Sequence, residues 1–297
     1  MPTDISVAIP DSCLSDEQTL RDKTLKIGKI ARASSIFRVK TIYLYDDRDS
    51  QAKKVDRRLI KLILTYLDTP QYLRKTLFPH MQELRYAGLL PPIKAPHHKE
   101  WHHIKSVKEG EIRVGVVVKV KEELFVDVGL GPLVPLEGKA PVGLKLNVQL
   151  KSPFSDLRAE KIDQQDITSY WGFRVHEARS LKTLLDKVRD SIVIITSRQG
   201  KSLKHFKSHI SNELAFKKRI LLVFGSPRKG VHQILSSEGH DISSYQFIVN
   251  MFPNQGTQTV RLEEAFFGSL AIINCLLDSY DRVKSSSSVL PITRSQI

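Results

Sequence analysis

Residues 247–274, FIVNMFPNQGTQTVRLEEAFFGSLAIIN, place a short apolar run, a polar loop and a helix in direct succession. The run at 247–252 is short enough to be a buried strand. The loop at 253–259 is rich in turn-forming residues, and Thr259 at its end can cap a helix. Apolar residues then recur at steps of three and four, which predicts a helix with one buried face. This order of elements is typical of a ligand site at the carboxyl end of a sheet strand.

A second stretch upstream repeats the arrangement. Residues 219–224, RILLVF, have the pattern of another buried strand, and the sequence GSPRKG follows at 225–230. Ser226 can cap a helix, Pro227 suits its first position, and Gly225 lets the backbone approach another group closely. Neither loop has the glycine spacing of a dinucleotide-binding fold or of a P-loop. The local pattern alone leaves two interpretations open, a ligand site or ordinary turns between core elements.

The composition predicts a globular protein with an anionic partner. With 297 residues, 41% of them hydrophobic and 26% charged, the chain is long enough for a good core and two domains. It has no apolar run of membrane-spanning length and only two cysteines, Cys13 and Cys275, which predicts a cytoplasmic protein without a disulfide framework. The net charge of +14 favours nucleic acid as the partner. The alternative is a basic protein whose charge only keeps it soluble.

Both ends of the chain alternate between strand and helix patterns. Short apolar runs predict strands at 6–10, 39–45, 170–176 and 191–196. Helices are predicted from a capping signal at 15–18 to about residue 37, and at 52–67. A strand–helix–strand order predicts parallel strands with helices packed on the faces of the sheet, which is an α/β fold.

The middle of the chain has a different residue pattern. Between 109 and 150, β-branched runs punctuated by glycines predict short strands at 112–120, 124–128 and 146–150, and therefore a small barrel. The preceding segment, 94–103, holds four histidines and Glu100, which are potential metal ligands. Its histidine pairs do not place their rings on one helix face, so we interpret it as a polar linker without a metal. Trp101 can anchor this linker or stack on a base.

Taken together, these motifs resemble the SPOUT superfamily of RNA methyltransferases. The resemblance rests on FGSP at 224–227, NQGTQTVRLEEA at 254–265 and IARASSIFRV at 30–39. The order of the parts is similar to the archaeal and eukaryotic branch, in which an OB-like barrel of the S1 type interrupts the methyltransferase domain. GVVVKV at 115–120 and FVDVG at 125–129 carry that second resemblance.

The superfamily implies a trefoil-knotted α/β domain with a mainly parallel sheet. Its two parts are expected at 1–90 and 161–284, interrupted by the small all-β barrel and its linker at 91–160. A mobile tail is expected at 285–297. The resemblance also implies S-adenosyl-L-methionine as the cofactor, held in three loops, of which 197–201 is the first. The expected cofactor-binding residues are Thr196, Ser197, Phe224, Gly225, Ser226, Pro227, Met251, Phe252, Pro253, Asn254, Gly256 and Thr257.

The catalytic residues are less constrained by the pattern. The first motif implies that Arg32 points into the active site, where it holds a phosphate or stabilises negative charge on the target nucleotide. On local pattern alone, Arg32 is a solvated charge on an amphipathic helix. Asn254, Arg261 and Glu263 are further catalytic candidates, with helix capping and dipole pairing as their alternative roles.

The implied activity is S-adenosylmethionine-dependent methylation of RNA, either ribosomal RNA or tRNA, for example at N3 of a uridine. Such a transfer needs positioning rather than a nucleophilic side chain. The expected RNA contacts are Arg21, Lys29, Trp101, Lys119, Arg228 and Lys229. A homodimer with its sites near the subunit interface is also implied. The alternatives are a non-catalytic RNA-binding scaffold that keeps the fold, as in ribosome assembly, and an enzyme that uses another nucleotide ligand.

Overall fold

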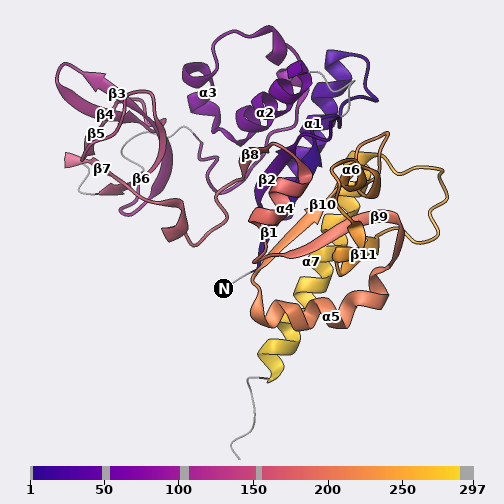
Figure 1. Cartoon of the computed structure of the whole chain (residues 1–297). Helices are drawn as coiled ribbons and strands as arrows, with labels where there is room; N and C mark the ends of the chain where they lie inside the picture. Colours follow the sequence, from indigo (N-terminus) through magenta and orange to yellow (C-terminus); the bar gives the residue numbers. More distant parts are fainter. Residues whose placement is uncertain (1–2, 49–53, 101–106, 152–155, 288–297) are drawn as a thin grey trace, which may run out of the picture. The chain divides into compact units, whose positions relative to one another are not determined.

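The computed structural model describes residues 3–48, 54–100, 107–151 and 156–287, and it divides the chain into two compact units (Figure 1). The first unit consists of Met1–Arg58 and Arg174–Ile297, and the second of Leu59–Phe173. The second unit is longer than the 91–160 insertion expected from the sequence, because it includes helical segments that precede the barrel. In the described part of the chain, no helix is both long and apolar enough to span a membrane.

A six-stranded sheet forms the centre of the first unit, in the order β11-β9-β10-β1-β2-β8. Every neighbouring pair is parallel, which confirms the predicted α/β class. Its strands are β1 (Asp4–Pro10), β2 (Val39–Tyr45), β8 (Arg174–Ala178), β9 (Ile192–Ser202), β10 (Arg219–Val223) and β11 (Phe247–Asn250). β8 begins four residues later than the predicted strand at 170–176, because Trp171 is buried in the core of the second unit instead.

Helices cover this sheet through their apolar faces (Figure 1). They are α1 (Leu20–Ile36), the first residues of α2 (Lys54–Asp68), α4 (Leu181–Lys187), α5 (Leu203–Phe216), α6 (Val231–Ser237) and α7 (Leu262–Ser287), with a 3-10 turn at Ile242–Ser244. α4 and α6 share a core with β1, β9 and β10, to which Leu184, Ile234 and Ile195 belong. On α7, Phe266, Leu270 and Ile273 are fully buried, as the periodicity predicted.

Three helix ends differ from the sequence expectation. α1 is capped by Thr19 rather than by a residue at 15–18, because the Thr19 hydroxyl accepts the Asp22 N–H at 3.1 Å. α7 begins at Leu262 rather than near Thr259, since the carbonyl of Arg261 accepts its first helical hydrogen bond, from Ala265 at 2.8 Å. α7 also continues through Ser287, so the first residues of the expected tail at 285–297 are helical. Residues 288–297 lie outside the described part of the chain.

β9 contains an irregularity that shapes one edge of the sheet. Ile195 pairs with Ile248 of β11, but the next pair is Lys201 with Val249. Residues 196–200 therefore stand out of the ladder before the chain resumes pairing. Because pairing with β11 resumes at Lys201, β9 extends to Ser202 and includes the segment 197–201, which was predicted as a loop. Gly200 permits the return, because a Cβ at this position would lie 2.6 Å from the carbonyl oxygen of Ile248.

The second unit is built around a closed five-stranded barrel, which confirms the small all-β insertion. The strand order is β3-β4-β5-β7-β6. Its strands are β3 (Ile112–Val120), β4 (Glu123–Asp127), β5 (Val134–Glu137), β6 (Lys145–Lys151) and β7 (Arg158–Lys161). Before the barrel come the end of α2, α3 (Gln71–Leu77) and 3-10 turns at Gln82–Leu84 and Ala87–Leu89, and another turn follows at Gln164–Asp166. Leu73 of α3 packs with Val114 and Trp171 on the outside of the barrel.

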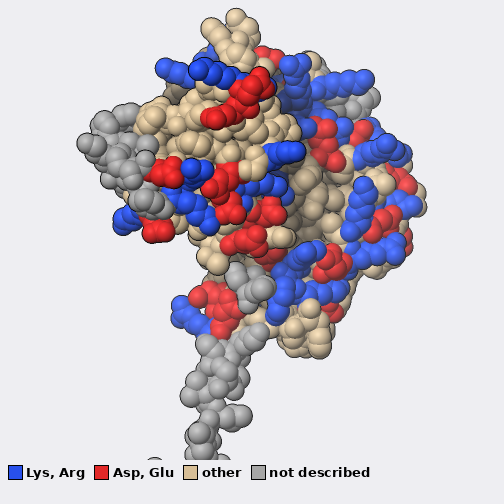
Figure 2. Space-filling view, turned by 90° about the vertical axis from the view of Figure 1, so that its left-hand side faces the viewer, with Lys and Arg blue, Asp and Glu red and all other residues tan. Residues whose placement is uncertain are grey.

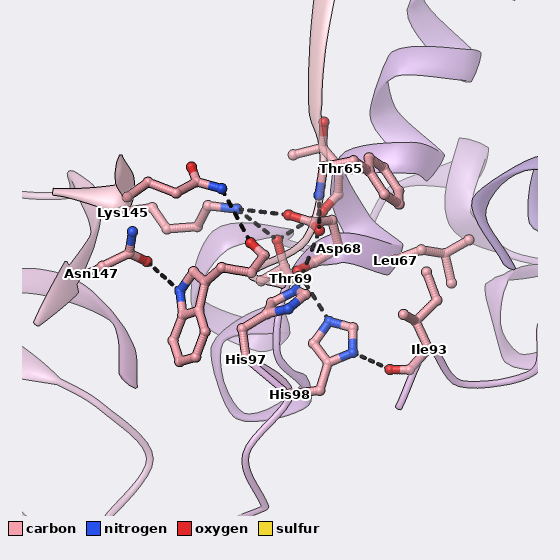
Figure 3. A network of polar contacts seen from close by, with 12 residues as sticks. Thr65, Leu67, Asp68, Thr69, Ile93, His97, His98, Lys145 and Asn147 are labelled. Atoms are coloured by element: carbon pink, nitrogen blue, oxygen red, sulfur yellow. Dashed lines mark hydrogen bonds and ion pairs between the residues drawn. The ribbon is translucent and has the colours of Figure 1, made fainter. Parts of the chain in front are cut away.

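Asp68, at the end of α2, binds together segments on both sides of the barrel in sequence (Figure 3). Its carboxylate accepts the Phe173 N–H at 3.1 Å and lies 3.9 Å from Lys145 Nζ of β6. Its carbonyl oxygen lies 2.9 Å from Nε2 of His97, whose side chain is buried. His98 packs on the His97 ring at 4.1 Å, and burial lowers the pKa of His98, as does the neighbouring His97. The segment expected as a polar linker, 94–103, is therefore anchored to the end of α2 by the buried His97. His102 and His103 lie outside the described residues.

Replacement of Gly200 tests the close approach of β9 to β11. Gly200→Ala forces a methyl group against the β11 backbone, so we expect a loss of about 1–3 kcal/mol in the free energy of unfolding. Urea denaturation followed by circular dichroism measures it. Gly88→Ala is the control, because a Cβ at Gly88 meets no atom within 4 Å. Equal stability of the two variants would contradict the tight packing at Gly200.

Candidate functional site

The three strands β9, β10 and β11 bring three loops to one edge of the sheet. The strands are neighbours and parallel, so the segments after Ile195, Val223 and Asn250 emerge on the same side. Thr196 Oγ1 of the first segment donates to the carbonyl of Val223, at the start of the second, at 2.8 Å. The structure thus brings together the segments that hold all twelve residues expected to bind a cofactor.

Hydrogen bonds also tie the first loop to the third. Asn250 Nδ2 donates to the carbonyl of Arg198 at 3.0 Å, and Arg198 Nη1 donates to the carbonyl of Gln258 at 2.8 Å. The bulge of β9 is therefore hydrogen-bonded through Arg198 to both the start and the end of the loop that follows β11. Ser197 Oγ accepts the Gln199 N–H at 3.2 Å, which turns the bulge back on itself.

The second loop is a tight turn rather than the start of a helix. Ser226 N–H donates to the carbonyl of Lys229 at 2.9 Å, and Ser226 Oγ accepts the Lys229 N–H at 3.0 Å. α6 starts only at Val231, so Ser226 is not its cap and Pro227 is not its first residue. Gly225 does make a close backbone approach, but to its own loop, because a Cβ there would lie 2.9 Å from the carbonyl oxygen of Lys229.

The third loop combines a buried start with an exposed tip. Met251 is buried, and the Phe252 ring packs where a Cβ of Gly268 on α7 would lie, 2.6 Å away. Asn250 Oδ1 accepts the Phe252 N–H at 3.0 Å, which makes the chain turn away from β11. Pro253, Asn254, Gly256 and Thr257 are exposed, and Asn254 adopts a positive φ of 64°. Backbone and amide groups of this tip are therefore accessible to a ligand.

The catalytic candidate Glu263 lies in a buried ion cluster. Its side chain is 5% exposed and lies 3.5 Å from Nζ of Lys26, which is itself only 1% exposed. Lys26 also contacts Asp16 at 2.5 Å and Glu17 at 3.9 Å. The cluster joins the segment before α1, α1 itself and the first turn of α7. This arrangement favours a positioning role for Glu263 over direct contact with a reactant, because Lys26 holds its carboxylate.

The other charged candidates are more accessible. Arg261 is 63% exposed in its side chain, and its Nη1 lies 3.8 Å from Glu17. Its backbone N–H donates to the Glu264 carboxylate at 2.9 Å, which is the capping contact at the start of α7. The Arg261 guanidinium takes no part in this contact. Arg32 lies on α1 with its side chain partly buried.

A group of three carboxylates at the ends of β1 and β2 escaped the sequence prediction. Asp11 follows β1, while Asp46 and Asp47 follow β2, and oxygens of all three lie within 4.8 Å of one another. Burial raises the pKa of Asp11 to about 6, with Arg57 lowering it and Asp46 and Asp47 raising it further. Asp46 and Asp47 looked like turn residues in the sequence. Only the alignment of parallel strands reveals that Asp11 is their neighbour.

The expected RNA contacts that the structure describes lie at exposed or partly exposed positions. Arg21, Lys29, Arg228 and Lys119 are exposed, and Lys229 is partly exposed. Lys29 lies 3.6 Å from Glu263, and Lys119 lies 3.1 Å from Glu122 within the barrel. Trp101 lies outside the described residues. On the face drawn in Figure 2, basic side chains are interspersed with acidic ones. Their role as RNA contacts stays a prediction.

The fold defines the class of protein, an α/β domain with a parallel sheet, together with a separate closed barrel. The sequence matches, over residues 4–273, the family described as "Putative RNA methyltransferase", and the chain belongs to this family. It is accordingly an RNA methyltransferase, an enzyme that transfers methyl groups.

Curated relatives share most of the chain. It is 31% identical to the human 28S rRNA (uridine-N(3))-methyltransferase, covering 92% of this chain and 78% of the relative. It is 30% identical to the mouse protein of the same name, covering 92% and 76% respectively. An uncharacterized protein of Halobacterium salinarum is 28% identical, covering 89% of this chain and 96% of that protein.

Removal of the buried cation tests the ion cluster. Lys26→Met removes the buried cation that faces Glu263 and Asp16 and leaves Glu263 with the exposed Lys29 at 3.6 Å, so we expect a loss of about 3 kcal/mol in the free energy of unfolding. Urea denaturation measures it. Lys40→Met is the matched control, because Lys40 is 55% exposed and its pair with Asp4 is worth less than about 1 kcal/mol. A loss no larger than that of the control would show that the cluster contributes little.

The raised pKa of Asp11 predicts a pH dependence of stability. A carboxyl group with a folded pKa near 6 and an unfolded pKa near 4 stabilises the fold in its protonated form, at low pH. As the pH rises from about 4 through about 6, that contribution is lost, up to about 3 kcal/mol. Asp11→Asn keeps the neutral form at every pH, so its stability relative to wild type rises across this window. Asp278→Asn, on the exposed face of α7, is the control. If the free energy of unfolding changes with pH in the same way for wild type and Asp11→Asn, the raised pKa of Asp11 is disproved.

Proposed function

We propose that this protein is an S-adenosyl-L-methionine-dependent methyltransferase that acts on N3 of a uridine in ribosomal RNA, on a SPOUT-type trefoil-knotted domain with an OB-like insert. The observation that carries the proposal is the loop cluster at the carboxyl edge of β9, β10 and β11, held together by Thr196, Arg198 and Asn250. The names of the human and mouse relatives, which specify uridine N3 of 28S rRNA, support the choice of acceptor.

The loops fit the cofactor through the kind of groups that they offer. A nucleoside with an amino-acid tail needs backbone donors and acceptors beside apolar surface. The exposed tip at Asn254–Thr257 offers backbone groups, and Met251 and Phe252 offer the apolar surface next to them. When bound, the cofactor supplies an electrophilic methyl group on a sulfonium. Residues of the first and second loops, such as Thr196 and Gly225, would complete the binding site.

The chain must position the uridine and assist the loss of its N3 proton. In the proposed reaction the bond between sulfur and the methyl group would break as the N3–CH3 bond forms, and the N3 proton would pass to water. The negative charge that develops on the base as this proton leaves needs a cation beside it. Arg261 and Arg32 are the proposed sources of this charge. In the proposed mechanism Glu263 positions the first turn of α7, through Lys26, rather than accepting the proton. Asn254 would contact the cofactor or the base at the tip of the third loop.

A homodimer is part of the proposal, because α1 and α7 expose apolar side chains next to each other. Phe267 of α7 is 47% exposed and packs edge-on against Phe37 at 5.2 Å, and Ile36 at the end of α1 is 50% exposed. A second copy of the chain placed on this surface would bury them next to Arg32, which is on the same helix.

Calorimetric titration with S-adenosylmethionine tests the cofactor site. We expect micromolar binding for the wild type and at least about tenfold weaker binding for Gly256→Leu, because the added side chain fills space that the ligand needs. A Cβ at Gly256 meets no protein atom within 4 Å, so the variant should fold normally. Gly88→Leu, at an equally open position of the second unit, is the control and should bind as the wild type does.

The scaffold alternative predicts a different result. A protein that only binds RNA would show no heat of binding with S-adenosylmethionine or S-adenosylhomocysteine while still retaining labelled RNA. Mass spectrometry of ribosomal RNA from a deletion strain provides the second measurement. The enzyme proposal requires that one N3-methyluridine disappears, and an unchanged set of modified nucleosides would overturn the assigned acceptor.

A further inference from the structure

One stretch of the first unit carries positive charge without any acidic residue. Between Asp190 and Glu213 the sequence has no Asp or Glu, but it has Arg198, Lys201, Lys204 and Lys207 at every third position. The stretch spans the bulge of β9 and most of α5. It is not among the segments that the sequence motifs associated with RNA.

The fold turns the lysines of this stretch outward. On the inner face of α5, Ile210 and Leu214 are fully buried and Phe206 packs edge-on against Phe247 of β11 at 5.8 Å. Lys204 and Lys207 are exposed on the same helix, and Lys201 is exposed just before it. The anchored inner face therefore fixes a row of three lysines in solvent.

These lysines differ from the surface cations that border the stretch. Arg189, Lys217 and Arg219 each pair with a nearby carboxylate, of Asp186, Glu213 and Asp190 respectively. Among the described residues, no carboxylate forms an ion pair with Lys201, Lys204 or Lys207. The first turn of α5 also holds no acidic residue, and its N-cap, Ser202, makes no side-chain hydrogen bond. Positive charge from the lysines and from the helix dipole thus adds at one place.

The row is continuous with the proposed active site at one end and with an aromatic side chain at the other. Arg198, at its start, donates to the carbonyl of Gln258 in the third loop. Phe216, at the end of α5, is 87% exposed. A helix rises 1.5 Å per residue, so Phe216 lies about 18 Å from Lys204, a distance that a few nucleotides cover. Unpaired lysines combined with an exposed aromatic ring suit the phosphates and bases of unpaired RNA.

We propose that Lys201, Lys204 and Lys207 form the surface that takes the RNA backbone next to the target nucleotide, with Phe216 stacking on a base. The proposal rests on the proposed function for its choice of RNA, and it assigns the main electrostatic contact to α5 rather than to the inserted barrel. RNA that lies along α5 would lead through Arg198 to the loop cluster.

Fluorescence anisotropy with a labelled stem-loop RNA that has a uridine-rich loop tests the surface across a range of salt concentrations. The logarithm of the binding constant falls with the logarithm of the salt concentration, and each contact to a single strand contributes about 0.7 to the steepness of that fall. The triple variant Lys201→Gln, Lys204→Gln, Lys207→Gln should therefore make the fall less steep by about 2. At 0.1 M salt this corresponds to about a hundredfold weaker binding, as each contact there contributes a factor of about five. Phe216→Ala should weaken binding about tenfold with an unchanged slope.

The control variant removes the same charge from paired positions. Lys40→Gln, Arg189→Gln, Arg219→Gln breaks three exposed ion pairs and should leave the slope close to that of the wild type. A barrel variant, Lys108→Gln, Lys119→Gln, Lys121→Gln, tests the competing surface. If the barrel variant lowers the slope and the α5 variant does not, the proposal is wrong. An equal loss in the α5 variant and the paired-charge control would also overturn it, since only net charge would then matter.

Calorimetric titration of an α5 variant with S-adenosylmethionine separates this proposal from the proposed function. Because Lys201 ends the first loop, cofactor binding is measured on the double variant Lys204→Gln, Lys207→Gln, and it should equal that of the wild type, since both of these lysines lie in α5 outside the three loops. If the wild type itself does not bind the cofactor, the proposed function fails, while the anisotropy series still decides whether α5 takes RNA.

Discussion

The position of β1 in the middle of the sheet is the constraint on which the first unit depends. β1 pairs with β2 on one side and with β10 on the other, so Asp4 lies opposite Arg219. Residues more than two hundred positions apart must therefore meet before the sheet is complete, which costs loop-closure entropy that only the buried apolar strands can offset. Val7, Ala8 and Ile9 are fully buried, as a strand covered on both faces must be. β10, β9 and β11, whose loops form the cluster, extend the sheet on one side of β1.

Lys26 provides a second long-range link, of a different physical kind. Its ammonium is removed from water and compensated by Asp16, Glu17 and Glu263, which come from two distant parts of the chain. Buried ion pairs contribute little net stability compared with apolar packing, but they tolerate few alternative arrangements. The cluster therefore fixes where α7 starts relative to α1. Because the third loop runs directly into α7, the same cluster also limits how that loop can move.

The second unit depends on a single carboxylate in a comparable way. Asp68 contacts His97, Lys145 and Phe173, which belong to three separate segments of that unit (Figure 3). Gly172 has a positive φ of 80°, and a Cβ there would lie 2.2 Å from the Asp68 carboxylate, so the chain can pass this close only as glycine. The barrel is thus attached to its flanking segments through specific polar contacts as well as through the apolar contacts of Leu73 and Trp171.

The sequence by itself determined the elements and their class. Short apolar runs such as 220–223 favour buried strands, and the spacing on α7 predicts one buried face, because both patterns follow from the geometry of the local backbone. The family motifs at 224–227 and 254–265 likewise lie in the loops that the structure brings together. Tertiary structure alone decided the rest. The bulge at 196–200, the burial of Glu263 by Lys26, and the meeting of Asp11 with Asp46 and Asp47 each depend on partners far away in sequence. No local pattern encodes such partners, because a side chain's charge, pKa and exposure are set by whatever the fold places beside it.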